Sequence, residues 1–181
     1  YGQLGNGGTN ADLNSPPSSP INLGTGRTAK AITGGEFHFC AILDDDSIKC
    51  WGQGTDGKLG TGFTGDRTTP TSTSGSFASG RYAVAIDAGY DHTCVILDNG
   101  QLTCWGSDSD GQLGNGATTG TKSSLQSSTV SLGTGRTAIS ISAGGTHTCA
   151  QLDNGQLKCW GNRADGQVGD NGNFNNPSDR T

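Results

Sequence analysis

The sequence predicts an all-β protein made of β-propeller blades: about three blades of three to four antiparallel strands each, part of a larger or oligomeric propeller. One observation behind this prediction is a block of 54 or 55 residues that occurs three times. The other is that each block holds three or four short strand-like runs and no segment with helical periodicity. Blocks of about 40–50 residues with this strand content are typical of propeller blades, and a long polar segment explains the extra length. We divide the single array 1–181 into repeats at about 1–55, 56–109 and 110–164, with a partial fourth at 165–181.

Each period begins with a Gly-x-Leu-Gly motif, which we predict to be a tight turn. Its apolar residue is expected in the core of the repeat, at Leu4, Leu59, Leu113 and Val168. A polar segment rich in Ser, Thr, Asn and Gly follows, over 6–22, 61–79 and 115–131. We expect a fourth, outer strand inside these segments, near Thr71 and near 128–130.

A short strand comes next, over 29–33, 83–88 and 138–143, and a glycine break separates it from a β-hairpin over 38–52, 92–106 and 147–161. In the second hairpin, Asp98-Asn99-Gly100 suits a type I turn closed by a glycine bulge, because Gly100 adopts positive φ without strain. The first hairpin has Asp46 at that position. Asp tolerates the left-handed region less well, so we expect this turn to be the weakest of the three.

The hairpin register predicts the pairing of the six cysteines. Folding about the turn sets Cys94 across the ladder from Cys104, within disulfide reach if the pair is a non-hydrogen-bonded one. The same register gives the other two pairs, Cys40 with Cys50 and Cys149 with Cys159. The alternatives are reduced thiol pairs or a metal site, although the spacing lacks the short Cys-x2-Cys knuckle that zinc favours. Disulfides imply an oxidising compartment, so we expect an extracellular or cell-surface protein.

One histidine and one tryptophan per hairpin complete the predicted repeat core: His38, His92, His147, Trp51, Trp105 and Trp160. Trp105 follows Cys104 directly and therefore points to the opposite face of its strand, where we expect it to pack on the neighbouring blade. The histidines occupy one equivalent position, and we expect them to hydrogen-bond backbone between strands. A metal role would require the three to converge, whereas blade rotation spreads equivalent positions around a ring.

Charge and motif content argue against several classes of function. A net charge of −5 gives no basic surface for binding nucleic acid, and no apolar run approaches the about 20 residues of a membrane span. No nucleophile–base pattern occurs, so we expect no enzyme activity and no cofactor. The acidic stretches 44–46 and 108–111 miss the calcium-loop pattern and are interpreted as turns. We expect Arg27, Arg81 and Arg136 to pair with nearby carboxylates or to cap loop carbonyls.

The motif His-Thr-Cys-x-x-Leu-Asp-Asn-Gly-x-Leu-x-Cys-Trp-Gly, followed by Gly-Gln-Leu-Gly-x-Gly, runs over residues 92–116. Each period resembles the regulator-of-chromosome-condensation repeat family on this motif, nearly from end to end. The resemblance implies a propeller, usually of seven blades, whose loops bind proteins. Its eukaryotic member is a nucleotide-exchange factor for a small GTPase on chromatin, and a secreted bacterial relative inhibits β-lactamases. This chain departs from the pattern in holding only three hairpins, and it begins with Tyr1, so we expect a processed protein or a fragment.

Three blades cannot close a ring and leave two sheet faces open. We therefore expect a disulfide-stabilised module that binds another protein or further copies of itself, with the variable polar segments as the place of recognition. The alternative is a carbohydrate-binding or adhesive surface module, which makes a glycan a possible partner. Guanine-nucleotide exchange is a weaker hypothesis, because disulfides place the chain outside the compartment of the GTPase. We expect no nucleic acid and no membrane span.

Overall fold

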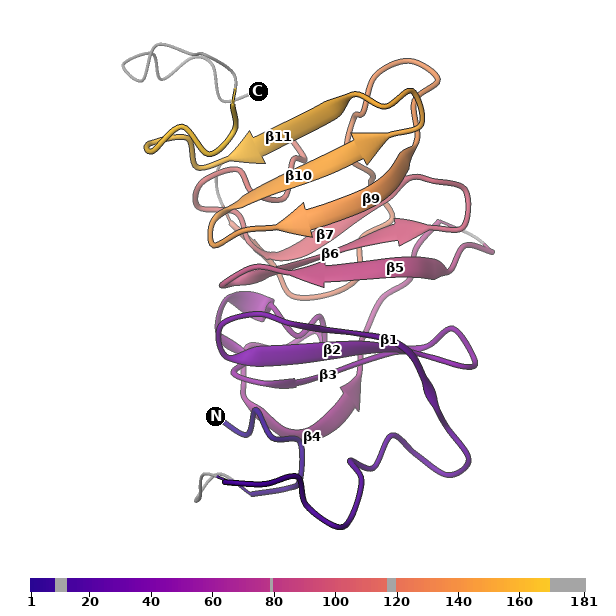
Figure 1. The fold of residues 1–181 in the computed structure, drawn as a ribbon, viewed down its shortest axis with the longest axis vertical. Helices are drawn as coiled ribbons and strands as arrows, with labels where there is room; N and C mark the ends of the chain where they lie inside the picture. Colours follow the sequence, from indigo (N-terminus) through magenta and orange to yellow (C-terminus); the bar gives the residue numbers. More distant parts are fainter. Residues whose placement is uncertain (9–12, 79, 117–119, 170–181) are drawn as a thin grey trace.

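Three antiparallel β-sheets, one per repeat, are stacked face to face along the chain (Figure 1). The protein is described by a computed structural model that covers residues 1–8, 13–78, 80–116 and 120–169. Sheet 1 contains β1 (Ala29–Gly34), β2 (His38–Leu43), β3 (Ile48–Gly52) and β4 (Arg67–Ser72). Sheet 2 contains β5 (Ala83–Ala88), β6 (His92–Leu97), β7 (Leu102–Ser107) and β8 (Thr121–Lys122). Sheet 3 contains β9 (Ala138–Ala143), β10 (His147–Leu152) and β11 (Leu157–Gly161).

This all-β architecture of stacked propeller blades is the predicted one. The helical content of the described residues is one 3-10 turn, η1 (Thr55–Gly57). No helix in the described part of the chain has the length and apolar character needed to span a membrane.

The hairpins have the predicted register. In the second repeat Cys94 lies opposite Cys104 and Ile96 opposite Leu102. The cysteines are joined within each hairpin, Cys40–Cys50, Cys94–Cys104 and Cys149–Cys159, with S–S distances of 2.08, 2.10 and 2.05 Å. At the turns, Asp46 has φ 66°, close to the values of 76° at Gly100 and 81° at Gly155. The first hairpin therefore holds a non-glycine residue in the left-handed region.

The outer strands differ in part from the prediction. The strand expected near Thr71 is β4, which pairs with β3. The strand expected at 128–130 was misplaced, because β7 pairs instead with β8, over Gly106↔Lys122 and Ser107↔Thr121. Residues 128–130 still follow β7: the Val130 amide donates to the Leu102 carbonyl, without a continuous ladder. Among the described residues, sheet 3 has no fourth strand.

Most of the core lies in two seams, which we define as the interfaces of sheet 1 with sheet 2 (first seam) and of sheet 2 with sheet 3 (second seam). A third buried cluster, Ala41, Leu43 and Trp51, lies on the other face of sheet 1. The first seam buries the Cys40–Cys50 disulfide and Leu59 against Val95, Leu97 and Trp105 of sheet 2. The second buries the Cys94–Cys104 disulfide and Leu113 against Ala150 and Leu152 of sheet 3. Each disulfide thus contributes apolar surface between sheets as well as a cross-link within its hairpin.

Two of the four residues predicted for this core are not part of it. Leu59 and Leu113 are buried, but Leu4 is 43% exposed and Val168 is half-buried. The reason is positional: Leu59 and Leu113 each lie between two sheets. In the described part of the chain, Leu4 has no sheet on the side away from sheet 1, and Val168 has none beyond sheet 3.

Candidate interaction surfaces

A chain of hydrogen bonds crosses the first seam. His38 Nε2 on sheet 1 lies 2.9 Å from Thr93 Oγ1 on sheet 2. Thr93 Oγ1 donates to the carbonyl of Lys58 over 3.0 Å, and Trp105 Nε1 donates to the same carbonyl over 3.0 Å. Because the hydroxyl donates to the carbonyl, its lone pair is free to accept from His38 Nε2–H.

The second seam repeats the arrangement atom for atom. His92 Nε2 lies 2.9 Å from Thr148 Oγ1, which donates to the Gln112 carbonyl over 3.0 Å. Trp160 Nε1 donates to that carbonyl over 3.0 Å as well. The expectation that the histidines bond backbone is therefore wrong for these two: their partner is a threonine side chain of the next sheet. The recurrence of Thr directly after His in two repeats was the available signal in the sequence.

Burial keeps the two seam histidines neutral. It lowers the pKa of His38 to about 3, with further lowering by the charges of Lys58 and His92. It lowers the pKa of His92 to about 4, helped by His147. The Nδ1 atom of each ring is buried without a hydrogen-bond partner among the described residues, so a second proton would have no acceptor. Both seams are therefore built for the uncharged imidazole.

The Gly-x-Leu-Gly turns fit against the tryptophans because their last residue lacks a side chain. The Gly60 amide donates to the Gly57 carbonyl over 2.8 Å, which closes the predicted turn. A Cβ on Gly60 would lie 2.8 Å from Trp105 Nε1, closer than real Cβ atoms approach, and one on Gly114 would lie 2.6 Å from Trp160 Nε1. Each turn thus presents its carbonyl and its flat glycine edge to the indole of the following sheet.

The outer face of sheet 3 carries the same kinds of residue as the seams, and no further sheet of the described residues packs on it. Leu157 is 71% exposed, whereas the equivalent Ile48 and Leu102, buried in the two seams, are 3% and 0% exposed. The Cys149–Cys159 disulfide and His147 are half-buried, while their counterparts in sheets 1 and 2 are buried. Within the described residues the imidazole of His147 has no hydrogen-bond partner, although its backbone carbonyl accepts from the Gly144 amide. We call this surface the sheet-3 face. It has the residues that the earlier sheet contributes to a seam.

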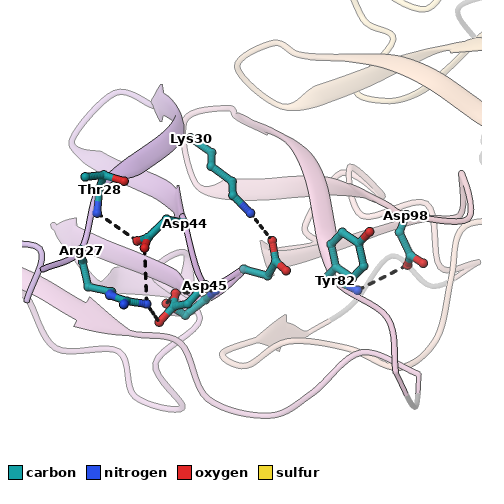
Figure 2. A network of polar contacts seen from close by, with 9 residues as sticks. Arg27, Thr28, Lys30, Asp44, Asp45, Tyr82 and Asp98 are labelled. Atoms are coloured by element: carbon teal, nitrogen blue, oxygen red, sulfur yellow. Dashed lines mark hydrogen bonds and ion pairs between the residues drawn. The ribbon is translucent and has the colours of Figure 1, made fainter.

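At the hairpin turns, arginines and carboxylates neutralise one another. Figure 2 shows Arg27 reaching Asp45, at 2.7 Å, while Asp44 accepts from the Thr28 amide over 2.9 Å. The side-chain and backbone hydrogen bonds from Ser47, followed by Arg27, lower the pKa of Asp45 to about 2. The other two repeats have equivalent ion pairs, Arg81–Asp98 at 2.9 Å and Arg136–Asp153 at 3.5 Å. The predicted carboxylate partners are therefore present in all three repeats.

The polar segments are partly structural. Residues of the 61–79 segment bond those of the 115–131 segment: the Gly62 amide donates to the Ser123 carbonyl over 2.6 Å, and the Leu125 amide donates to the Ser74 carbonyl over 2.8 Å. Leu125 also packs against the first seam. These contacts assign parts of both segments to the junction between repeats. No cluster of three or more His, Cys, Asp or Glu in the described residues has a geometry that could hold a metal ion.

Comparisons with known proteins agree with this repeat architecture. A family model described as the regulator of chromosome condensation (RCC1) repeat matches residues 29–58, 83–112 and 138–167, and a second model of the same description matches 45–96 and 99–151. The ultraviolet-B receptor UVR8 of Arabidopsis thaliana is 31% identical over 144 residues, which are 79% of this chain and 32% of the receptor. The chain thus spans about a third of the length of this curated relative.

Two solved structures share the fold. Human WBSCR16 superimposes with a TM-score of 0.75 at 19% identity, over 89% of this chain and 40% of that protein. Prp20p of Saccharomyces cerevisiae, whose structure was described together with its binding properties to Gsp1p and histones, superimposes with a TM-score of 0.64 at 21% identity, over 77% of this chain and 33% of Prp20p. Both chains are longer, and the match covers a part of each.

Proposed function

The chain belongs to the regulator of chromosome condensation (RCC1) repeat family, and we propose that it is an extracellular, disulfide-stabilised propeller module that binds another protein, or further copies of its own kind, through the sheet-3 face. The observation that carries the proposal is the exposure of Leu157, at a position that is buried wherever a sheet follows. Leu157, exposed beside the half-buried Cys149–Cys159 disulfide, offers apolar surface to a binding partner.

Two further observations support this proposal. Prp20p, a propeller with the same fold, is described with binding properties to Gsp1p and histones, which are proteins. The three disulfides favour an oxidising compartment, which supports the extracellular or cell-surface location. Neither a cofactor nor a catalytic role is part of the proposal.

The test compares two lysine substitutions on sheet 3. Leu157→Lys places a charge on the sheet-3 face, at the start of β11. Ile139→Lys is the matched control, because Ile139 is 58% exposed on β9 and its equivalent in sheet 2, Val84, is 53% exposed although sheet 2 is covered on both faces. Wild type and both variants are immobilised and exposed to extracellular fluid of the source organism, and retained proteins are identified by mass spectrometry.

The proposal expects a protein that is retained by wild type and by Ile139→Lys but lost with Leu157→Lys, and that binds again after purification. Loss of at least about tenfold in affinity with Leu157→Lys corresponds to the removal of one buried apolar contact. Retention that is the same for all three chains would refute the sheet-3 face as the binding site. A glycan bound on an array equally by all three chains would favour the adhesive or carbohydrate-binding alternative.

A further inference from the structure

Tyr90 holds an exposed aromatic ring in a fixed place. It lies in the loop between β5 and β6 of the middle sheet and is 53% exposed, although sheets pack against both faces of this sheet. Its amide donates to the Gly145 carbonyl over 3.0 Å, which ties the loop to the corresponding loop of sheet 3. The ring lies against Gly145, where an added Cβ would be 2.9 Å from Tyr90 Cε2. A glycine thus supports the ring on one side, and much of the rest of it faces solvent.

The residue after this tyrosine carries a carboxylate that is also held in place. Lys58, whose side chain is fully buried, donates to Asp91 Oδ1 and, over 2.6 Å, to Gln53 Oε1. The Asp91 side chain is 39% exposed, and its Oδ2 has no hydrogen-bond partner among the described residues. The buried ammonium therefore fixes one carboxylate oxygen and leaves the other as an acceptor at the surface.

An exposed aromatic ring and a fixed carboxylate together suit an uncharged sugar. A pyranose has an apolar face of C–H groups that packs on an aromatic ring, and its hydroxyls donate to a carboxylate. Lys58 neutralises Asp91, so the pair has no excess charge with which to attract a cation. Because the ring and the carboxylate are both held before a ligand arrives, binding loses little side-chain entropy.

The other two repeats lack this combination. The positions of Tyr90 and Asp91 are taken by Glu36 and Phe37 in the first repeat and by Gly145 and Thr146 in the third. The position of Lys58 is taken by Gln112 in the second turn. The arrangement is therefore particular to the middle sheet and is not required by the packing of the repeats.

We propose that Tyr90 and Asp91 form a binding site for an uncharged oligosaccharide, in which one pyranose stacks on the Tyr90 ring and a hydroxyl of the adjoining unit donates to Asp91 Oδ2. The Tyr90 ring lies toward sheet 3, whereas Asp91 reaches back to Lys58 in the turn that follows sheet 1, so two linked sugar units are needed to contact both. Gly145 and Lys58 are positioning residues. This inference goes beyond the proposed function and gives the carbohydrate-binding alternative a site of its own.

The test measures the binding of four uncharged disaccharides, cellobiose, lactose, chitobiose and mannobiose, by saturation-transfer NMR and titration calorimetry. At least one should bind wild type with a Kd of about 1 mM or tighter. Tyr90→Ala should weaken this binding at least about fivefold, and Tyr90→Phe should retain it, because phenylalanine keeps the ring. Tyr82→Ala is the matched control: Tyr82 is 43% exposed at the opposite end of β5 and should leave the affinity unchanged when replaced.

Two further variants test the positioning residues. Gly145→Ala should weaken binding at least about threefold, since its methyl group displaces the Tyr90 ring at a position where φ is not positive and alanine is tolerated. Lys58→Gln combined with Asp91→Asn removes both charges, so that no buried charge is left unpaired. It should also weaken binding at least about threefold, because an amide oxygen is a weaker acceptor than a carboxylate. Urea unfolding reports that each variant is folded.

Absence of binding by all four disaccharides to wild type would overturn the inference, and so would binding that Tyr90→Ala leaves unchanged. Oligolysine that binds in place of the disaccharides, and is lost with Tyr90→Ala, would assign the ring to a cationic peptide and overturn it as well. The exposed Glu36, on the loop beside that of Tyr90, would then be the counter-charge. Leu157→Lys should bind the disaccharides as wild type does, so failure of this site and failure of the sheet-3 face show in different variants.

Discussion

Acidification should weaken the seams well above the pH at which carboxylates titrate. His38 and His92 are neutral in the folded protein, with pKa values of about 3 and about 4, and in the unfolded chain each has the ordinary value of 6.5. Below pH 6.5 the unfolded state therefore binds protons that the folded state does not, and the free energy of unfolding falls with pH. The loss ends only when the folded-state pKa values are reached.

The magnitude follows from the pKa difference. Between about pH 7.5 and about pH 5, each histidine removes about 2 kcal/mol from the free energy of unfolding, so the two remove about 4 kcal/mol. That is a large share of the about 5–15 kcal/mol of a typical domain. The His38 ring is buried in the first seam and the His92 ring in the second. Solvent screening therefore reduces the 4 kcal/mol total little.

Urea unfolding followed by tryptophan fluorescence, at several pH values across this range, measures the effect. His38→Gln and His92→Gln should each halve the pH dependence, because glutamine keeps a donor for the threonine hydroxyl but does not titrate. A wild-type free energy of unfolding that is flat between these pH values would refute the assignment of neutral seam histidines. Variants with the full wild-type slope would refute it equally.

Three further predictions concern stability. Asp46→Gly should raise the free energy of unfolding by about 1 kcal/mol, measured by urea unfolding, because glycine relieves the left-handed strain at φ 66°. Gly60→Ala should cost more than about 2 kcal/mol in the same assay, since its methyl group would displace the facing indole, while Gly116→Ala, with positive φ but open space, should cost only about 1 kcal/mol. Under limited reductant, the Cys149–Cys159 disulfide should be reduced first, because it alone among the three disulfides is half-exposed. Alkylation followed by peptide mass spectrometry measures the order of reduction, and earlier reduction of a seam disulfide would contradict the prediction.

The hairpins were predictable from the sequence because every determinant is local. Alternating apolar residues, a turn with Gly100 or Gly155, and cysteines ten residues apart fix strand, turn and register within fifteen residues. The outer strand of sheet 2 was not predictable in the same way. Residues 121–122 have no strand pattern of their own and pair with β7 because the polar segments of two repeats bond one another there.

The seam network could not be derived from local patterns, since its partners are far apart in the chain. Thr93 lies 55 residues from His38, and the one signal in the sequence, the recurrence of Thr directly after His92 and His147, does not say which residue the hydroxyl meets. Leu4 shows the converse limit. Its motif is the same as that of Leu59, yet burial depends on whether a second sheet lies against it, and that is a property of the stack and not of the repeat.

The direction of the indole hydrogen bonds has a consequence for synthesis on the ribosome. Trp51, Trp105 and Trp160 each donate to a carbonyl 48, 47 and 48 residues earlier in the chain. Every newly made hairpin therefore finds its docking turn already translated, and the growing chain can add sheets one at a time from its amino end. The histidine of the latest sheet, by contrast, waits for the threonine of the sheet that is made next, which gives folding of this array a vectorial order.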